Sequence, residues 1–241
     1  MSRRTIGLIA LLSFCLVLPA AAQEPAAPAA GTKDHATAVK ESLQKSMAAL
    51  RQYQWVETTA VSMKGEEKSR DQKTCYYGAD GKVQKTPVAA APAPAKDDKR
   101  SRGVKARVVE NKTEEISDAV KEAIGLVKQY VPPDPARIQS AKDAGRVSVT
   151  PPDPAGQVRL VIKDYLKPGD SLTLDANAAT DRISGVTVAT FTEKAKDAVG
   201  LKVAFGAFAD GTVYPSNIQL DVAAQNLAIA IENSGYKKVG G

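Results

Sequence analysis

Residues that could carry nucleophilic or acid–base chemistry are scarce in this 241-residue chain, which has one histidine, His35, and two cysteines, Cys15 and Cys75. A serine hydrolase needs a base beside its nucleophile, and a zinc site needs three or four Cys, His, Asp or Glu ligands. The sequence contains no Gly-x-Ser-x-Gly motif, no glycine-rich phosphate loop and no dinucleotide-binding fingerprint. We therefore predict a protein that is not an enzyme and that needs neither a cofactor nor a metal ion.

Carboxylates are the remaining candidates for chemistry, because a pair of them can cleave a glycosidic bond. Six acids fall at predicted turns or at solvent-facing strand positions, where a structural role is expected: Asp164, Asp170, Asp175, Asp181, Asp210 and Asp221. Glu57 differs from these because it interrupts an apolar set of alternating residues. Two interpretations stay open, a position at a sheet edge or cavity mouth and a functional buried carboxylate.

His35 and Cys75 both have ordinary structural interpretations. His35 lies among polar residues where a helix is expected to begin, so we expect an exposed side chain in the first turn. Cys75 lies within the strand-like segment 73–77, which is typical of a small buried residue. No internal disulfide is expected once a leader carrying Cys15 is removed, so stability must come from burial of apolar side chains.

The elements that would position any site are clearest in the C-terminal third. Six segments there place apolar side chains two residues apart: Val158/Leu160/Ile162, Leu172/Leu174, Val186/Val188, Leu201/Val203/Phe205, Ile218/Leu220/Val222 and Leu227/Ile229/Ile231. A period of two puts each set on one side of a pleated sheet. We predict an antiparallel meander with one apolar face and one solvent-facing face, and the apolar face requires a cover.

The N-terminal half supplies this cover and further strands. Asp34 can cap a helix with an apolar stripe formed by Val39, Leu43, Met47 and Leu50. From residue 53 the period changes to two, which predicts one strand over 53–64, a polar strand ending at residue 77, and a short strand over 82–86. The sequence leaves open whether these strands join the C-terminal sheet.

Two more helices are expected before the meander. Asn111 followed by Glu114 resembles a capping box, and the stripe after it predicts a second helix ending near Tyr130: Ile116, Val120, Ile124 and Val127. Asp134 and Pro135 predict the start of a short third helix that Gly145 ends, and a brief strand is expected at 147–149.

The first residues predict where the protein is located. Arg3 and Arg4 precede an apolar run from Ile6 to Leu18 and the small residues Ala20-Ala21-Ala22. This pattern is typical of a signal peptide over 1–22 that is cleaved after Ala22, with an uncleaved membrane anchor as the alternative. We expect a periplasmic or secreted protein with a disordered Ala/Pro tract at 23–33 and a single domain over 34–241.

Positive charge is concentrated in one segment. The formal net charge is +6, and removal of Arg3 and Arg4 leaves +4 (6 − 2). Residues 82–112 contain nine Lys or Arg and three Asp or Glu, and residues 87–107 have the composition of a disordered insertion. Six of the basic residues could contact an anionic surface: Lys96, Lys99, Arg100, Arg102, Lys105 and Arg107. A solvated loop is the other interpretation, and nucleic acid is not an expected partner because the segment lacks aromatic residues for base stacking.

The closing segment supports a family resemblance. The sequence Asp210-Gly-Thr-Val-Tyr-Pro215 is followed by Asn233-Ser-Gly-Tyr-Lys-Lys238, after a Tyr53-x-Trp55 strand and a hairpin with Asp80-Gly81. In this order the chain resembles the periplasmic lipoprotein-carrier superfamily, LolA/LolB-like. The resemblance implies an α+β fold, in which a curved antiparallel sheet forms an incomplete β-barrel and helices pack against its concave face.

The function that we predict follows from this fold. A concave apolar face covered by helices can bind a hydrophobic ligand such as an acyl chain, a lipid or a lipoprotein. The residues predicted to line the site are Trp55, Val61, Met63, Leu201, Val203, Phe205, Leu220 and Ile229. The alternative is a cell-envelope interaction module with a solid core, in which the basic loop forms the contact surface.

Overall fold

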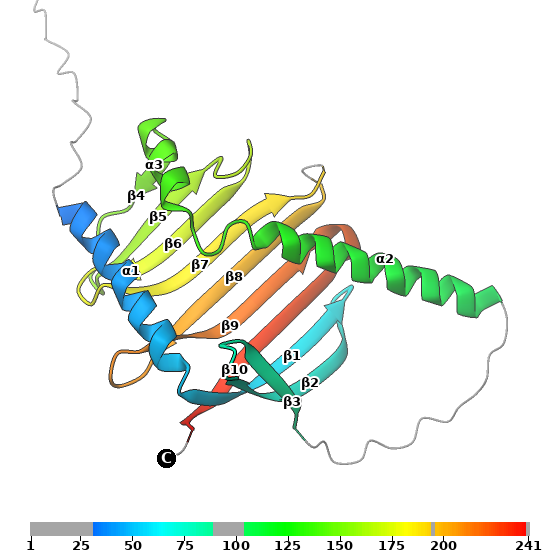
Figure 1. Ribbon diagram of the computed structural model, residues 1–241. Coiled ribbons are helices and arrows are strands. Elements are labelled where there is room, and N and C mark those ends of the chain that lie inside the picture. The colour runs from blue at the N-terminus through cyan, green and yellow to red at the C-terminus, as the bar shows by residue number, and fades with distance from the viewer. Residues whose placement is uncertain (1–30, 89–103, 194–195, 240–241) are drawn as a thin grey trace, which may run out of the picture.

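The computed structural model describes residues 31–88, 104–193 and 196–239, which form one open sheet with helices on one face (Figure 1). The ten strands are all antiparallel to their neighbours, in the order β3-β2-β1-β10-β9-β8-β7-β6-β5-β4. The elements are α1 (Gly31–Leu50), β1 (Tyr53–Met63), β2 (Glu66–Tyr77), β3 (Val83–Pro87), α2 (Val104–Val127), α3 (Pro135–Asp143), β4 (Val147–Val149), β5 (Gln157–Lys163), β6 (Ser171–Asn177), β7 (Arg182–Phe191), β8 (Ala198–Ala207), β9 (Val213–Val222), the 3₁₀ turn η1 (Ala223–Gln225) and β10 (Leu227–Lys238).

The sheet confirms the predicted fold class. The six predicted strands of the meander are β5 to β10, each paired with the next in sequence. The N-terminal strands join the C-terminal sheet, which the sequence had left open, because β1 pairs with β10 from Tyr53↔Lys238 to Met63↔Leu227. Strands β3 and β4 form the two edges and do not pair with each other, so the sheet does not close into a barrel.

Helices α1 and α2 lie over the same face of the sheet, which we call the helix-covered face (Figure 1). Helix α1 contacts β7 and β9, and its buried Ser46 hydroxyl accepts a hydrogen bond from the backbone N–H of Val213 at 2.9 Å. Helix α2 contacts β8 and β9 and buries Ala123 and Val127. In Figure 1 the two helices cross opposite ends of the strands, so the middle of this face lies between them.

The stripe predicted for α1 is wrong at one position. Met47 is 59% exposed, whereas Ser46 and Leu50 are buried. A helix has 3.6 residues per turn, so the stripe that starts at Val39 and Leu43 continues through residue 46, about 100° away from residue 47. The small polar Ser46 fits against the sheet because its hydroxyl also donates to the backbone carbonyl of Ser42 at 2.8 Å.

Helix α2 begins earlier than predicted, and α3 begins where predicted. Helix α2 starts at Val104 rather than near Asn111, since the Lys-, Arg-, Glu- and Ala-containing residues before that position are compatible with helix. In α3 the Asp134 carboxylate accepts a hydrogen bond from the Ala136 N–H at 2.9 Å, with Pro135 in the first turn. Gly145 follows the helix with φ of +68°, a conformation that favours glycine.

A buried polar cluster ties the segment after α2 to the sheet. The Asp170 carboxylate, only 3% exposed, accepts hydrogen bonds from the Tyr130 hydroxyl at 2.5 Å and from the N–H groups of Tyr165 at 2.6 Å and Lys167 at 2.9 Å. The Tyr130 hydroxyl also lies 2.7 Å from Thr190 Oγ1. Burial raises the pKa of Tyr130, and the adjacent Asp170 raises it further. The predicted structural role of Asp170 in a turn therefore extends to a tertiary anchor.

Six aromatic side chains gather where β1 begins and β10 ends. Their ring centroids lie 4.5 to 5.7 Å apart, and the members are Tyr53, Trp55, Tyr77, Phe208, Tyr214 and Tyr236. The Trp55 indole N–H donates to Asn233 Oδ1 at 3.1 Å, and the Asn233 amide donates to the Pro215 carbonyl at 3.0 Å. The residues that carried the family resemblance, in 210–238, thus contribute directly to this aromatic cluster.

We expect Gly206→Ala to destabilise the fold by about 2 kcal/mol, the usual range for overpacking. A Cβ atom at Gly206 would lie 2.6 Å from Cζ of Tyr214, whose ring packs against Phe208 and Tyr236 and has little room to move. Gly200→Ala in the same strand is the matched control, because its nearest neighbour would be Asp221 Cβ at 3.8 Å. Urea unfolding measures both changes, and equal stability of the two variants would contradict this packing.

Candidate functional site: an apolar face between two helices

Two rows of apolar side chains cross the helix-covered face at right angles to the strands. In the covered row, each residue is paired in register with the next: Val61, Ile229, Leu220, Leu201, Val188, Leu172, Ile162 and Val147. In the central row, two residues further along each strand, the pairing is Thr59, Ile231, Ile218, Val203, Val186, Leu174, Leu160 and Val149. Alternation along the strands places both rows on the same face.

The two rows differ in exposure to solvent. In the covered row five side chains are buried: Ile162, Leu172, Val188, Leu201 and Leu220. In the central row Val186 is buried, Val149 is 47% exposed, and the other members are partly exposed. The central row is therefore a strip of apolar surface that water still reaches.

Seven of the eight predicted site residues lie on or beside these rows, and Trp55 lies elsewhere. Val61, Leu201, Leu220 and Ile229 belong to the covered row, and Val203 belongs to the central row. Met63 and Phe205 are partly buried and pack against the same core cluster. Trp55 is buried within the aromatic cluster.

The sequence did not predict four partly exposed members of the central row as site residues. Ile231, Ile218, Leu174 and Leu160 were assigned to the correct strands but not to the site. Their positions two residues from the chosen ones put them on the correct face, which was the available signal. Their exposure depends on where the helices lie, and the strand pattern does not contain that information.

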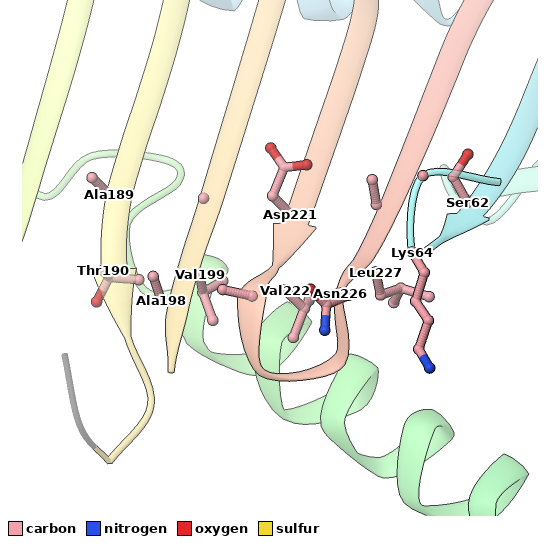
Figure 2. Close-up of a pocket in the computed structure, with 14 residues that line it drawn as sticks. Ser62, Lys64, Ala189, Thr190, Ala198, Val199, Asp221, Val222, Asn226 and Leu227 are labelled. Atoms are coloured by element: carbon pink, nitrogen blue, oxygen red, sulfur yellow. The ribbon is translucent and has the colours of Figure 1, made fainter. Parts of the chain in front are cut away.

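Two pockets lie along the sheet, and the central-row residues Ile218 and Ile231 are among the residues that line the second. One of about 540 Å³ lies at the strand ends. Figure 2 shows Ala189 of β7, Asp221 of β9 and Ser62 of β1 along it, with Lys64 and Asn226 beside the turns. Asp221 alternates with the buried Leu220 and Val222, so it lies on the face opposite the helices. A second pocket of about 370 Å³ has a polar rim: Thr58, Arg70, Lys202, Asn217, Gln219 and Glu232. None of the eight predicted residues is among the described residues that line either pocket.

Glu57 lies near the sheet edge, as one of the two interpretations predicts, and the structure does not test the functional role that the other assigns to it. Its side chain is 12% exposed, and its two carboxylate oxygens lie 2.6 and 2.7 Å from Lys85 Nζ. It faces the helix-covered side near the sheet edge formed by β3, so it is a largely buried carboxylate in an ion pair. Cys75, paired in register with Trp55, is fully buried as predicted, and burial raises the pKa of its thiol.

The other carboxylates have structural partners. Asp175 forms an ion pair with Arg159 at 2.7 Å, and Asp164 accepts the Gly169 N–H at 2.7 Å. Hydrogen bonds from Thr212 lower the pKa of Asp210, which is exposed in the β8–β9 turn. Among the described residues, no group of three or more His, Cys, Asp or Glu side chains could hold a metal ion.

Several predictions concern residues outside the described part of the chain. The leader at 1–22, most of the tract at 23–33 and the basic residues Lys96, Lys99, Arg100 and Arg102 lie there. Lys105 and Arg107 lie within α2, and His35 lies within α1, but their side chains are not described. Within the described ranges, no helix is both long enough and apolar enough to cross a membrane.

Comparison with known proteins gives matches in structure. No protein-family model and no curated protein sequence match the chain. The chain is similar to a LolA superfamily protein from Nitrosomonas europaea, with 9% identity, a TM-score of 0.37, and coverage of 84% of this chain and 94% of that one. It is also similar to a DUF1329 family protein from Desulfovibrio piger, with 8% identity, a TM-score of 0.35, and coverage of 87% and 93%. The first of these structures is from the superfamily that the sequence resembles.

Proposed function

We propose that this protein is an exported, non-enzymatic carrier that holds the apolar chain of a lipid or lipoprotein against the central row. The observation that carries the proposal is the partial exposure of apolar side chains along this row. Ile231, Ile218 and Val203 lie on the adjacent strands β10, β9 and β8, and Leu174 and Leu160 lie on β6 and β5, with the buried Val186 of β7 between the two groups. A contiguous exposed apolar surface marks an interaction site, because each buried methylene contributes about 0.8 kcal/mol.

The length of the central row suits an acyl chain. From β1 to β5 it crosses six strand spacings. At about 4.8 Å per spacing, this is on the order of 29 Å. The hydrocarbon core of a bilayer is about 30 Å thick and holds two leaflets, so one chain needs roughly 15 Å. The row therefore accommodates a single acyl chain along its length, with α1 and α2 on either side.

The proposed location follows from the leader. A cleaved signal peptide over 1–22 would deliver the protein to the periplasm or the exterior, where an apolar chain needs a carrier to cross water. A chain with a single mature cysteine, Cys75, is compatible with an oxidising compartment because no internal disulfide has to form.

Detergent-free purification of the mature protein, followed by native mass spectrometry and organic extraction, tests the proposal. We expect a population heavier than the polypeptide by the mass of a lipid, and the same lipid in the extract. A protein that has only the polypeptide mass, and that stays so after incubation with lipid vesicles, would contradict the carrier function.

A further inference from the structure

The side chains on the helix-covered face change from apolar to charged at one side of the sheet. Strands β5 to β10 carry Val, Leu and Ile along the covered and central rows, whereas β2 and β3 carry charged side chains on the same face. Register places Asp71 opposite Thr59, Lys73 opposite Glu57, and Lys85 opposite Cys75. An apolar strip with a charged end has the polarity of an amphiphile, with a tail and a head.

The four charges at this end sum to zero. Glu57 and Lys85 neutralise each other in the ion pair already described. Lys73 and Asp71 are different, because neither side chain forms a hydrogen bond or ion pair with any other described residue. They lie two residues apart on β2, so one ammonium and one carboxylate remain available side by side on the same face.

We propose that Lys73 and Asp71 bind the zwitterionic head of the amphiphile whose tail lies on the central row. This inference rests on the proposed function and adds the class of head group. Lys73 would contact the phosphate and Asp71 the ammonium. Asp71 would repel an anionic head and Lys73 would repel a cationic head, so charge complementarity favours a head that carries both signs.

Isothermal titration with four dodecyl probes, each below its critical micelle concentration, tests the inference. The probes are dodecylphosphocholine, dodecyl maltoside, dodecyl phosphate and dodecyltrimethylammonium. We expect the wild type to bind dodecylphosphocholine most tightly. Lys73→Gln and Asp71→Asn should each weaken its affinity by about threefold to fivefold, the effect of losing one partly exposed charge pair, and leave maltoside affinity unchanged.

Lys163→Gln is the matched control, because this exposed lysine follows the buried Ile162 on β5 and points to the opposite face. It should bind every probe as the wild type does. The inference is overturned if Lys73→Gln or Asp71→Asn leaves dodecylphosphocholine affinity unchanged, or if dodecyl phosphate or dodecyltrimethylammonium binds the wild type more tightly than dodecylphosphocholine does. If the head-group inference fails in this way but dodecyl maltoside still binds, the carrier function stands. If none of the four probes binds, both proposals are overturned.

Discussion

Replacement of Asp170 by Asn should be the most destabilising single change at a polar position of this fold, with a loss of about 3 kcal/mol or more in unfolding free energy. In the wild type, the donors of Tyr130, Tyr165 and Lys167 all bond to the carboxylate of Asp170 in a nearly solvent-free site. Asn has one oxygen acceptor in place of two, and its amide N–H₂ would face one or more of these donors. Each buried bond to a charged acceptor contributes about 1.5–3 kcal/mol. The large loss of unfolding free energy is expected because several such bonds end on this one side chain.

Urea unfolding followed by Trp55 fluorescence measures this loss. Asp210→Asn is the control, since Asp210 lies in an exposed turn and accepts the Thr212 N–H at 2.8 Å. A much smaller loss is expected for it. If both variants lose the same stability, the cluster of Tyr130, Asp170 and Thr190 does not anchor the segment after α2 to the sheet.

Replacement of Ile231 by Glu should abolish ligand binding while the protein stays folded. Ile231 is partly exposed on the central row between Thr59 and Ile218. A carboxylate there would be buried without a partner beneath an apolar chain, at a cost of several kcal/mol. We expect at least about a hundredfold loss of affinity for an acyl probe, since each tenfold loss corresponds to about 1.4 kcal/mol.

Ala230→Glu is the control for this variant. Ala230 is the preceding residue of β10, is exposed, and lines a pocket on the opposite face. Its affinity for the probe should match that of the wild type. Equal loss in both variants would show that charge on β10 disturbs the sheet as a whole, and unchanged binding by the Ile231 variant would remove the central row from the site.

The strand assignments were predictable because the period of two fixes both the element and its buried face. Alternation such as Leu201/Val203/Phe205 predicts a strand and one apolar side without knowledge of the partner strand. Pairing of β1 with β10 joins residues far apart in the chain, and no local pattern encodes that contact. The exposed central row follows from the same long-range arrangement.

The helices show where local patterns were insufficient. Met47 belongs to an apolar set by spacing, yet the hydrogen bond between Ser46 and Val213 rotates α1 so that Ser46 faces the sheet and Met47 faces solvent. The sequence predicts only a turn at Asp170, because the backbone N–H groups that it accepts from, those of Tyr165 and Lys167, come just before it in the same loop. Its bond to Tyr130 comes from another part of the chain and needed the structure.

The most direct test of the carrier function is to locate a bound chain by NMR. A fatty acid with a ¹³C-labelled tail would be added to protein labelled at Ile, Leu and Ala methyl groups, and intermolecular NOEs, which report only direct contact, would be recorded. We predict NOEs from the tail to Ile231, Ile218 and Leu174 and none to Ala230 and Ala204 on the opposite face. NOEs confined to the opposite face, or none at saturating probe, would contradict an acyl chain on the central row.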